Sequence, residues 1–241
     1  MNIFFKPKKQ TFAFGSLLKT DMHSHVLPGI DDGAPDLETS LYLVEGLMRN
    51  GYERLIATPH IMSDHYPNTP QSINQALKVL RKALQEKGIT IPIEAAAEYM
   101  LDDNFENLLT AGELLTFGDK YLLVETFFQS LPPNFQSILF QLQLQNYRVV
   151  LAHPERYHYV SEDLQFLEEL KEKGVHLQVN ALSFTGYYGK REKMIAERML
   201  DAELIDFIGS DMHHQRHLET LEKVNLSVNV IQKLERIEST F

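Results

Sequence analysis

The 241-residue sequence contains no cysteine. This absence excludes disulfide bonds, thiolate zinc sites, iron–sulfur clusters and enzymes with a cysteine nucleophile, including phosphatases that act through a cysteinyl-phosphate. Basic residues are also few, with 23 Lys plus Arg against 33 Asp plus Glu and a formal charge of −10. A nucleic-acid-binding protein needs a basic surface, so this charge argues against one. An anionic substrate would need local positive charge from metal ions or arginines.

Long apolar runs are absent too. No segment approaches the ~18–20 apolar residues of a membrane span, so no transmembrane segment is expected. Lysines and a proline interrupt residues 1–19, which excludes a signal peptide and makes the cytoplasm the expected location. Residues 1–19 contain four lysines, four phenylalanines and no acid. We expect 1–19 to form a basic, loosely packed N-terminal extension, with contact to a membrane or partner as the alternative, and 20–241 to form one domain.

Short apolar segments alternate with amphipathic ones along the chain. Helices are predicted at residues 36–50, 71–87 and 161–173, each followed by the glycine that commonly ends a helix. Further helices are predicted at 134–145 and 191–201, with a helical or loose segment at 219–239. The alternation predicts βαβ units, which build a parallel sheet or barrel with helices outside. The seven predicted strands are residues 19–26, 54–58, 91–97, 121–125, 148–152, 175–179 and 206–209.

Side chains that bind metals follow nearly every predicted strand at its carboxyl end. In a parallel barrel these ends meet on one face, where the active site lies. Alternation along a strand directs His23 and His25 to one side, and likewise Asp211 and His213. Imidazoles and carboxylates without sulfur suit zinc, manganese or iron, and so many donors favour two or three ions. The candidates are His23, His25, His60, Glu98, Glu125, His153, Asp211 and His213, with Asn180 after the sixth strand.

The candidate ligands lie in distinct motifs, which are Asp21-Met22-His23-Ser24-His25-Val26-Leu27-Pro28-Gly29-Ile30-Asp31-Asp32-Gly33, Thr58-Pro59-His60, Glu98, Glu125, His153-Pro154-Glu155-Arg156 and Ser210-Asp211-Met212-His213. These motifs resemble those of the PHP (polymerase and histidinol phosphatase) superfamily. Within it, the Pro-Gly-Ile-Asp-Asp-Gly string and the His-Pro-Glu-Arg motif resemble the bacterial capsule-associated tyrosine-protein phosphatases of the CpsB/CapC type. The resemblance covers about residues 20–216, and its first motif is highly specific.

The resemblance implies an α/β fold: a distorted TIM-like (β/α)₇ barrel of the PHP type, formed by residues 20–241, with the metal site at the C-terminal ends of the strands. It implies three divalent metal ions, usually Mn²⁺, with Fe or Zn as alternatives. Glu98 and Glu125 are the candidates for bridging carboxylates. Glu94 lies on the same strand face, and Glu98 is preferred because it lies nearer the carboxyl end. The implied metal ligands are His23, His25, Asp32, His60, Glu98, Glu125, His153, Asp211 and His213.

The implied function is that of a metal-dependent phosphomonoester hydrolase, specifically a protein-tyrosine phosphatase. Its expected substrate is a phosphotyrosine protein, the tail of a bacterial tyrosine kinase in capsule or exopolysaccharide biosynthesis. Clustered divalent ions would activate a hydroxide and offset phosphoryl charge. Arg156 and Arg216 are the candidate catalytic residues that clamp phosphoryl oxygens, because a planar guanidinium binds two oxygens at once. Relatives place the second arginine at a slightly different offset from Arg216.

Two other functions stay open from the sequence: a small-molecule phosphoesterase of the histidinol-phosphatase kind, and a non-catalytic scaffold stabilised by metals. Relatives often carry a second histidine where Ile61 stands, so its contribution is either absent or supplied by His65. Asp21 and Asp31 are candidates for orienting the ligand imidazoles or are plain turn residues. Structural roles are expected for His158, His176 and His217. Tyr187 and Tyr188 are expected either to pack within their loop or to border the substrate entrance.

Overall fold

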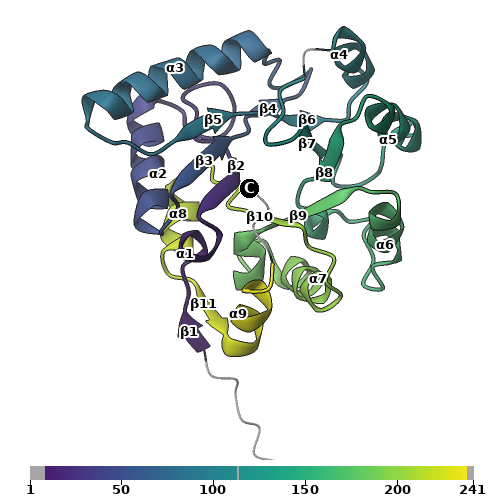
Figure 1. The fold of residues 1–241 in the computed structure, drawn as a ribbon. Coiled ribbons are helices and arrows are strands. Elements are labelled where there is room, and N and C mark those ends of the chain that lie inside the picture. The colour runs from purple at the N-terminus through teal and green to yellow at the C-terminus, as the bar shows by residue number, and fades with distance from the viewer. Residues whose placement is uncertain (1–8, 113, 238–241) are drawn as a thin grey trace, which may run out of the picture.

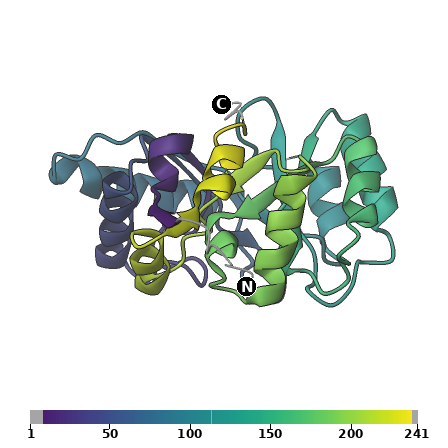
Figure 2. The same ribbon diagram turned by 90° about the horizontal axis from the view of Figure 1, so that it is seen from below.

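The computed structural model describes residues 9–112 and 114–237 as an α/β fold with a curled parallel sheet at its centre. The helices lie around the outside of the strands, as Figure 1 shows and Figure 2 shows from below. The hydrogen-bonded strand orders are β10-β9-β8-β7-β6-β4 and β2-β3-β5, and their pairings are parallel. These strands are β2 (Thr20–Ser24), β3 (Arg54–Ala57), β4 (His60–Ile61), β5 (Ile93–Ala95), β6 (Glu98–Met100), β7 (Tyr121–Glu125), β8 (Arg148–Leu151), β9 (His176–Asn180) and β10 (Phe207–Gly209).

Each of the seven predicted strands contains a strand of this sheet. Two predicted segments continue after a short break, so that β3 is followed by β4 and β5 by β6. Backbone hydrogen bonds bridge the break, with Ala96 N donating to Ala57 O and Glu98 N donating to Pro59 O. At the other edge, a bridge between Ser24 and Met212 brings the end of β2 beside the segment after β10. The carboxyl ends of distant strands therefore lie close together.

The predicted helices form, and local sequence explains where they begin. Asp36 caps the first of them by accepting a hydrogen bond from Thr39 N at 2.8 Å. Thr69 and Ser72 form a capping box before the second. The helix predicted at 161–173 begins later than expected, because Leu164 has a positive φ of 62°. These helices are α2 (Leu37–Arg49), α3 (Pro70–Glu86), α5 (Phe135–Leu144), α6 (Gln165–Glu172) and α7 (Lys190–Asp201), and a short helix that was not predicted is α4 (Phe105–Ala111).

Both ends of the described chain differ from expectation. The segment 219–239 is not one helix, and its residues 238 and 239 lie outside the described part. It comprises the end of α8 (Gln215–Leu221), β11 (Asn225–Ser227) and α9 (Val228–Leu234). β11 interrupts the helical segment and pairs antiparallel with β1 (Lys9–Thr11).

The loose packing expected of the N-terminal extension does not hold for residues 9–18. Phe14, in α1 (Phe14–Leu18), is fully buried against Phe12 and Phe184. Phe14 and Leu18 therefore belong to the core, and Phe12 packs against it. Lys6 and Lys8 lie outside the described residues. No helix in the described ranges has the length and apolar character needed to cross a membrane.

Candidate metal centre

All nine predicted ligands lie together in the structure. They form four overlapping groups in which ligand atoms lie within 4.8 Å of one another. We call these nine residues the donor cluster. The groups are His25, Asp32, His60 and His213; His23, Glu98 and His153; His23, His25 and Asp211; and His60, Glu98 and Glu125.

Glu98 occupies the middle of the donor cluster. Its Oε2 atom lies 3.2 Å from His23 Nε2, and 3.3 Å from both His25 Nε2 and His60 Nδ1. Its Oε1 atom lies 3.0 Å from His153 Nε2. Glu94, the alternative considered from sequence, is exposed and pairs with Arg54 instead. The choice of Glu98 over Glu94 therefore agrees with their placement.

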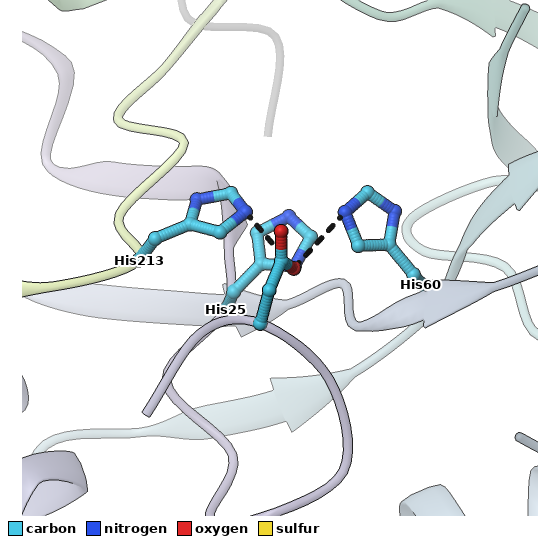
Figure 3. Close-up of side chains that lie close together, drawn as sticks. His25, His60 and His213 are labelled. Carbon is cyan, nitrogen blue, oxygen red and sulfur yellow. Dashed lines mark ion pairs between the residues drawn. The ribbon is translucent and has the colours of Figure 1, made fainter. Parts of the chain in front are cut away.

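A second part of the donor cluster surrounds Asp32. Figure 3 shows the rings of His25, His60 and His213 arranged around one carboxylate, which is that of Asp32. Its Oδ1 atom lies 3.4 Å from His60 Nε2 and 3.5 Å from His213 Nε2. Asp32 is half exposed, whereas His25 is fully buried. This part of the cluster therefore opens toward solvent.

Neighbouring carboxylates raise the pKa values of the buried imidazoles. Burial alone lowers the pKa of His23, but the charges of Glu98 and Asp211 outweigh burial and raise it to about 9. Burial opposes protonation of His25 as well, and Asp31 raises its pKa to about 9. The pKa of Glu98 lies well below its usual value, because the charges of nearby histidines outweigh its burial. The buried carboxylates thus require positive charge beside them, either as protons on imidazoles or as bound cations.

The residues present fit a group of divalent cations. His60 Nδ1 and Glu125 Oε1 are buried and lie 2.9 Å apart, but neither makes a well-formed hydrogen bond among the described residues. A buried polar atom without a partner is costly, and coordination to a cation removes that cost. Nitrogen and carboxylate oxygen donors without sulfur suit manganese, iron or zinc.

Side chains outside the donor cluster fix the orientation of its imidazoles. His25 Nδ1 donates to Asp31 Oδ2 at 2.8 Å, and His23 Nδ1 donates to Gln178 Oε1 at 2.9 Å. Each bond leaves Nε2 available for a metal ion. Asp21 instead accepts hydrogen bonds from Ser210 and from the backbone N–H of His23, and from no imidazole among the described residues.

Gln178 was missed from the sequence, although one signal was present. Gln178 and Asn180 lie two residues apart on β9 and therefore share a face. Gln178 Nε2 donates to Asn180 Oδ1 at 2.9 Å, and Asn180 Nδ2 donates to Asp211 Oδ2 at 2.6 Å. The signal in the sequence was the amide side chain of Gln178, two positions before the candidate site residue Asn180 and so on the same strand face.

Replacing Asp31 by asparagine is expected to weaken metal binding by about 10- to 100-fold, because an uncharged amide with one acceptor oxygen replaces the carboxylate that accepts from His25 Nδ1, Gly33 N and His60 N. Titration of metal-free protein with Mn²⁺ measures this affinity. Asp36→Asn is the matched control, because Asp36 caps α2 on the surface. Unchanged affinity in Asp31→Asn, or an equal loss in the control, would contradict the orienting role.

Arg156 lies at the edge of the donor cluster. Its Nη1 atom donates to Asp211 Oδ2 at 3.1 Å. Its guanidinium carbon lies 4.9 Å from the ring centroid of Phe128 and 4.5 Å from that of Tyr188. The two aromatic rings and Asp211 hold the planar group against the centre.

Arg216 is placed differently from the sequence expectation. It is exposed on α8, with its guanidinium carbon 5.6 Å from the ring centroid of Tyr187, and it lines a different hollow. The helix turn explains this placement. His217 on α8 lines the hollow beside the donor cluster, and Arg216 precedes it by one residue, which leaves Arg216 on another face of the helix. The structure therefore does not bring Arg216 to the donor cluster.

A hollow of about 560 Å³ opens beside the donor cluster. His65 lines it, as does Tyr188, whereas His176 lies at the opposite end of the strands next to Asp206. His217 was expected to have only a structural role, but it also lines this hollow. Its Nδ1 atom lies 3.1 Å from Asp211 O. The other lining residues outside the donor cluster that were not predicted are Met62, Tyr66, Met100, Phe127, Phe128, Gln129 and His214.

Imidazoles and carboxylates gathered at one end of a curled parallel sheet, beside a guanidinium, are typical of metal-dependent hydrolases of the α/β class. The chain belongs to the CpsB/CapC family of capsular polysaccharide synthesis, whose model matches residues 19–234. This match confirms the family resemblance seen in the motifs.

Named relatives agree with this membership. The chain is 35% identical over 195 residues to the tyrosine-protein phosphatase YwqE of Bacillus subtilis, covering 80% of this chain and 77% of YwqE. It is 26% identical to the tyrosine-protein phosphatase CpsB of Streptococcus pneumoniae, covering 80% of this chain and 82% of CpsB. A solved chain from the work on YwqE and CpsB, described as unique metal-dependent tyrosine phosphatases, superimposes with a TM-score of 0.78 at 31% identity, covering 92% of this chain and 88% of that chain.

Proposed function

We infer that this protein is a metal-dependent protein-tyrosine phosphatase. The observation that carries the inference is the convergence of nine donors and Arg156 beside one open hollow, which six of the donors line. Family membership and the phosphatase relatives support the same reaction. Their role in capsular polysaccharide synthesis supports a role of this chain in capsule or exopolysaccharide production.

The chain's own residues supply binding and orientation for phosphomonoester hydrolysis. The donor cluster would hold the metal ions, which lower the pKa of water and offset charge on the phosphoryl group when bound. Arg156 approaches phosphoryl oxygens with the guanidinium nitrogens that Asp211 does not use. A phenolate leaving group, with a parent pKa of about 10, places little demand on a general acid.

The finer architecture is part of the proposal. The strand orders and the bridge from Ser24 to Met212 support a closed, distorted (β/α)₇ barrel of the PHP type formed by residues 20–241. Nine donors in four overlapping groups support three divalent ions, with Mn²⁺ as the first candidate and iron or zinc as alternatives. The proposed substrate is a phosphotyrosine protein of the cytoplasm, such as the tail of a bacterial tyrosine kinase.

Metal analysis together with an activity assay tests this function. We expect purified protein supplied with Mn²⁺ to hydrolyse a phosphotyrosine peptide far better than histidinol phosphate. Greater turnover of histidinol phosphate would favour a small-molecule phosphoesterase. A metal-loaded protein that hydrolyses no phosphomonoester would favour the scaffold alternative.

Chelators and thiol reagents are expected to have opposite effects on activity. Removal of metal by a chelator should abolish hydrolysis, and added Mn²⁺ should restore it. Iodoacetamide should leave the rate unchanged, because the chain contains no cysteine. Turnover that persists in the fully metal-free protein would contradict the metal-dependent mechanism.

A further inference from the structure

A second hollow, of about 410 Å³, lies near the catalytic one, and four basic residues line it. Among the described residues, Glu219 is the single acid in its lining. In a chain with a formal charge of −10, this hollow is a local reversal of sign. Figure 1 shows that α8, β11 and β1, which contribute to its walls, lie on one flank of the molecule. We call it the basic hollow, and its cations are Lys9, Lys193, Arg216 and Lys223.

These cations have little countercharge within the protein. Among the described residues, Lys9, Arg216 and Lys223 form no ion pair, and all three are exposed. Lys193 has only Glu197, at 3.7 Å. By contrast, Lys171 lies 2.6 Å from Asp206 at the far end of the strands. The basic hollow therefore keeps positive charge available for an external anion.

Two tyrosines separate the basic hollow from the catalytic one. Arg216 lies over the ring of Tyr187 at 5.6 Å, and Tyr187 contacts Tyr188 with ring centroids 5.1 Å apart. Tyr188 in turn lies 4.5 Å from the guanidinium carbon of Arg156. This path from Arg156 to Arg216 spans at most ~15 Å, a length that an extended peptide covers in about five residues. The guanidinium groups of Arg156 and Arg216 are thus no farther apart than about five extended residues can reach.

We propose that the basic hollow binds an anionic segment of the phosphotyrosine substrate, within about five residues of the phosphotyrosine. The binding groups are carboxylates or a second phosphate on the same chain. Like-charge repulsion from the acidic remainder of this protein would disfavour such substrates, and the unpaired cations reverse that effect locally. The inference rests on the proposed phosphatase function and adds a preference among its substrates.

Three phosphotyrosine peptides of equal length test the proposal: one with glutamates four and five residues from the phosphotyrosine, one with glutamines there, and one with a second phosphotyrosine. We expect the wild-type protein to show a KM about 3- to 10-fold lower for an anionic peptide than for the glutamine peptide, with similar kcat. The advantage should shrink as salt rises, because exposed charges are screened. The two anionic peptides distinguish carboxylate from phosphate as the bound group.

The variant Lys193→Gln/Lys223→Gln should lose this advantage. Its metal content and its turnover of p-nitrophenyl phosphate should stay unchanged, because that small substrate occupies only the catalytic hollow. The matched control is Lys78→Gln/Lys82→Gln, which removes the same charge from α3.

Three results would overturn the proposal while leaving the phosphatase function intact. They are equal KM values of the wild type for all three peptides, an equal loss of preference in the control variant, and binding to anionic lipid vesicles without any peptide preference. Failure of the wild type to hydrolyse p-nitrophenyl phosphate and the glutamine peptide would instead count against the phosphatase function itself.

Discussion

Replacing Asp211 by alanine is expected to remove bound metal and activity together, lowering turnover of a phosphotyrosine peptide by about 10³-fold or more. The two oxygens of Asp211 serve different neighbours. Oδ1 lies 3.3 to 3.5 Å from nitrogens of His23, His25 and His213. Oδ2 accepts hydrogen bonds from Arg156 and Asn180. The substitution therefore removes a metal donor and the anchor of the arginine at once.

Metal content by mass spectrometry and kcat by a peptide assay check this result. Asp201→Ala is the control, because Asp201 is an exposed acid at the end of α7 that pairs with Lys233. Asp211→Ala should keep the circular dichroism spectrum of the wild type, because the apolar core does not include Asp211. Full activity in Asp211→Ala would contradict the assignment of the donor cluster as the catalytic centre.

The donor cluster could be predicted because strand geometry is regular. Side chains two residues apart share a face, and the carboxyl ends of parallel strands meet at one edge. Those two facts place His23, His60, His153 and Asp211 in one region once the strands are identified. The structure brings them together. The half-exposed Asp32 was different, since it lies on a loop and only the motif resemblance pointed to it.

Positions set by packing between distant segments were not predictable in this way. Arg216 lies on a helical turn whose direction depends on how α8 packs, and one residue of rotation moves a side chain by about 100°. The antiparallel pairing of β1 with β11 joins segments separated by more than 200 residues in the sequence, from Lys9 to Ser227. No local pattern encodes such a contact. Short strands in otherwise polar segments carry too few residues for a period to emerge.

The proposed mechanism therefore needs two kinds of residue, the metal ligands and Arg156. In the proposed mechanism the ligands hold metal ions near phosphorus, and the places of most of these ligands follow from the sheet. Arg156 depends on its surroundings, since Phe128, Tyr188 and Asp211 fix its guanidinium. A variant that removes the guanidinium alone separates the two contributions.

Arg156→Ala is expected to keep the metal ions and lose turnover by about 10²- to 10³-fold, the usual cost of removing one donor that stabilises transition-state charge. The metal ions stay because Asp211 retains the oxygen that faces His23, His25 and His213. Arg156→Lys should recover only part of the rate, because an ammonium group cannot form two parallel bonds to phosphoryl oxygens. Metal analysis beside kcat distinguishes this outcome from that of Asp211→Ala. Loss of metal in Arg156→Ala would show that the arginine acts by supporting the donor cluster, whereas full turnover with full metal content would remove it from the reaction.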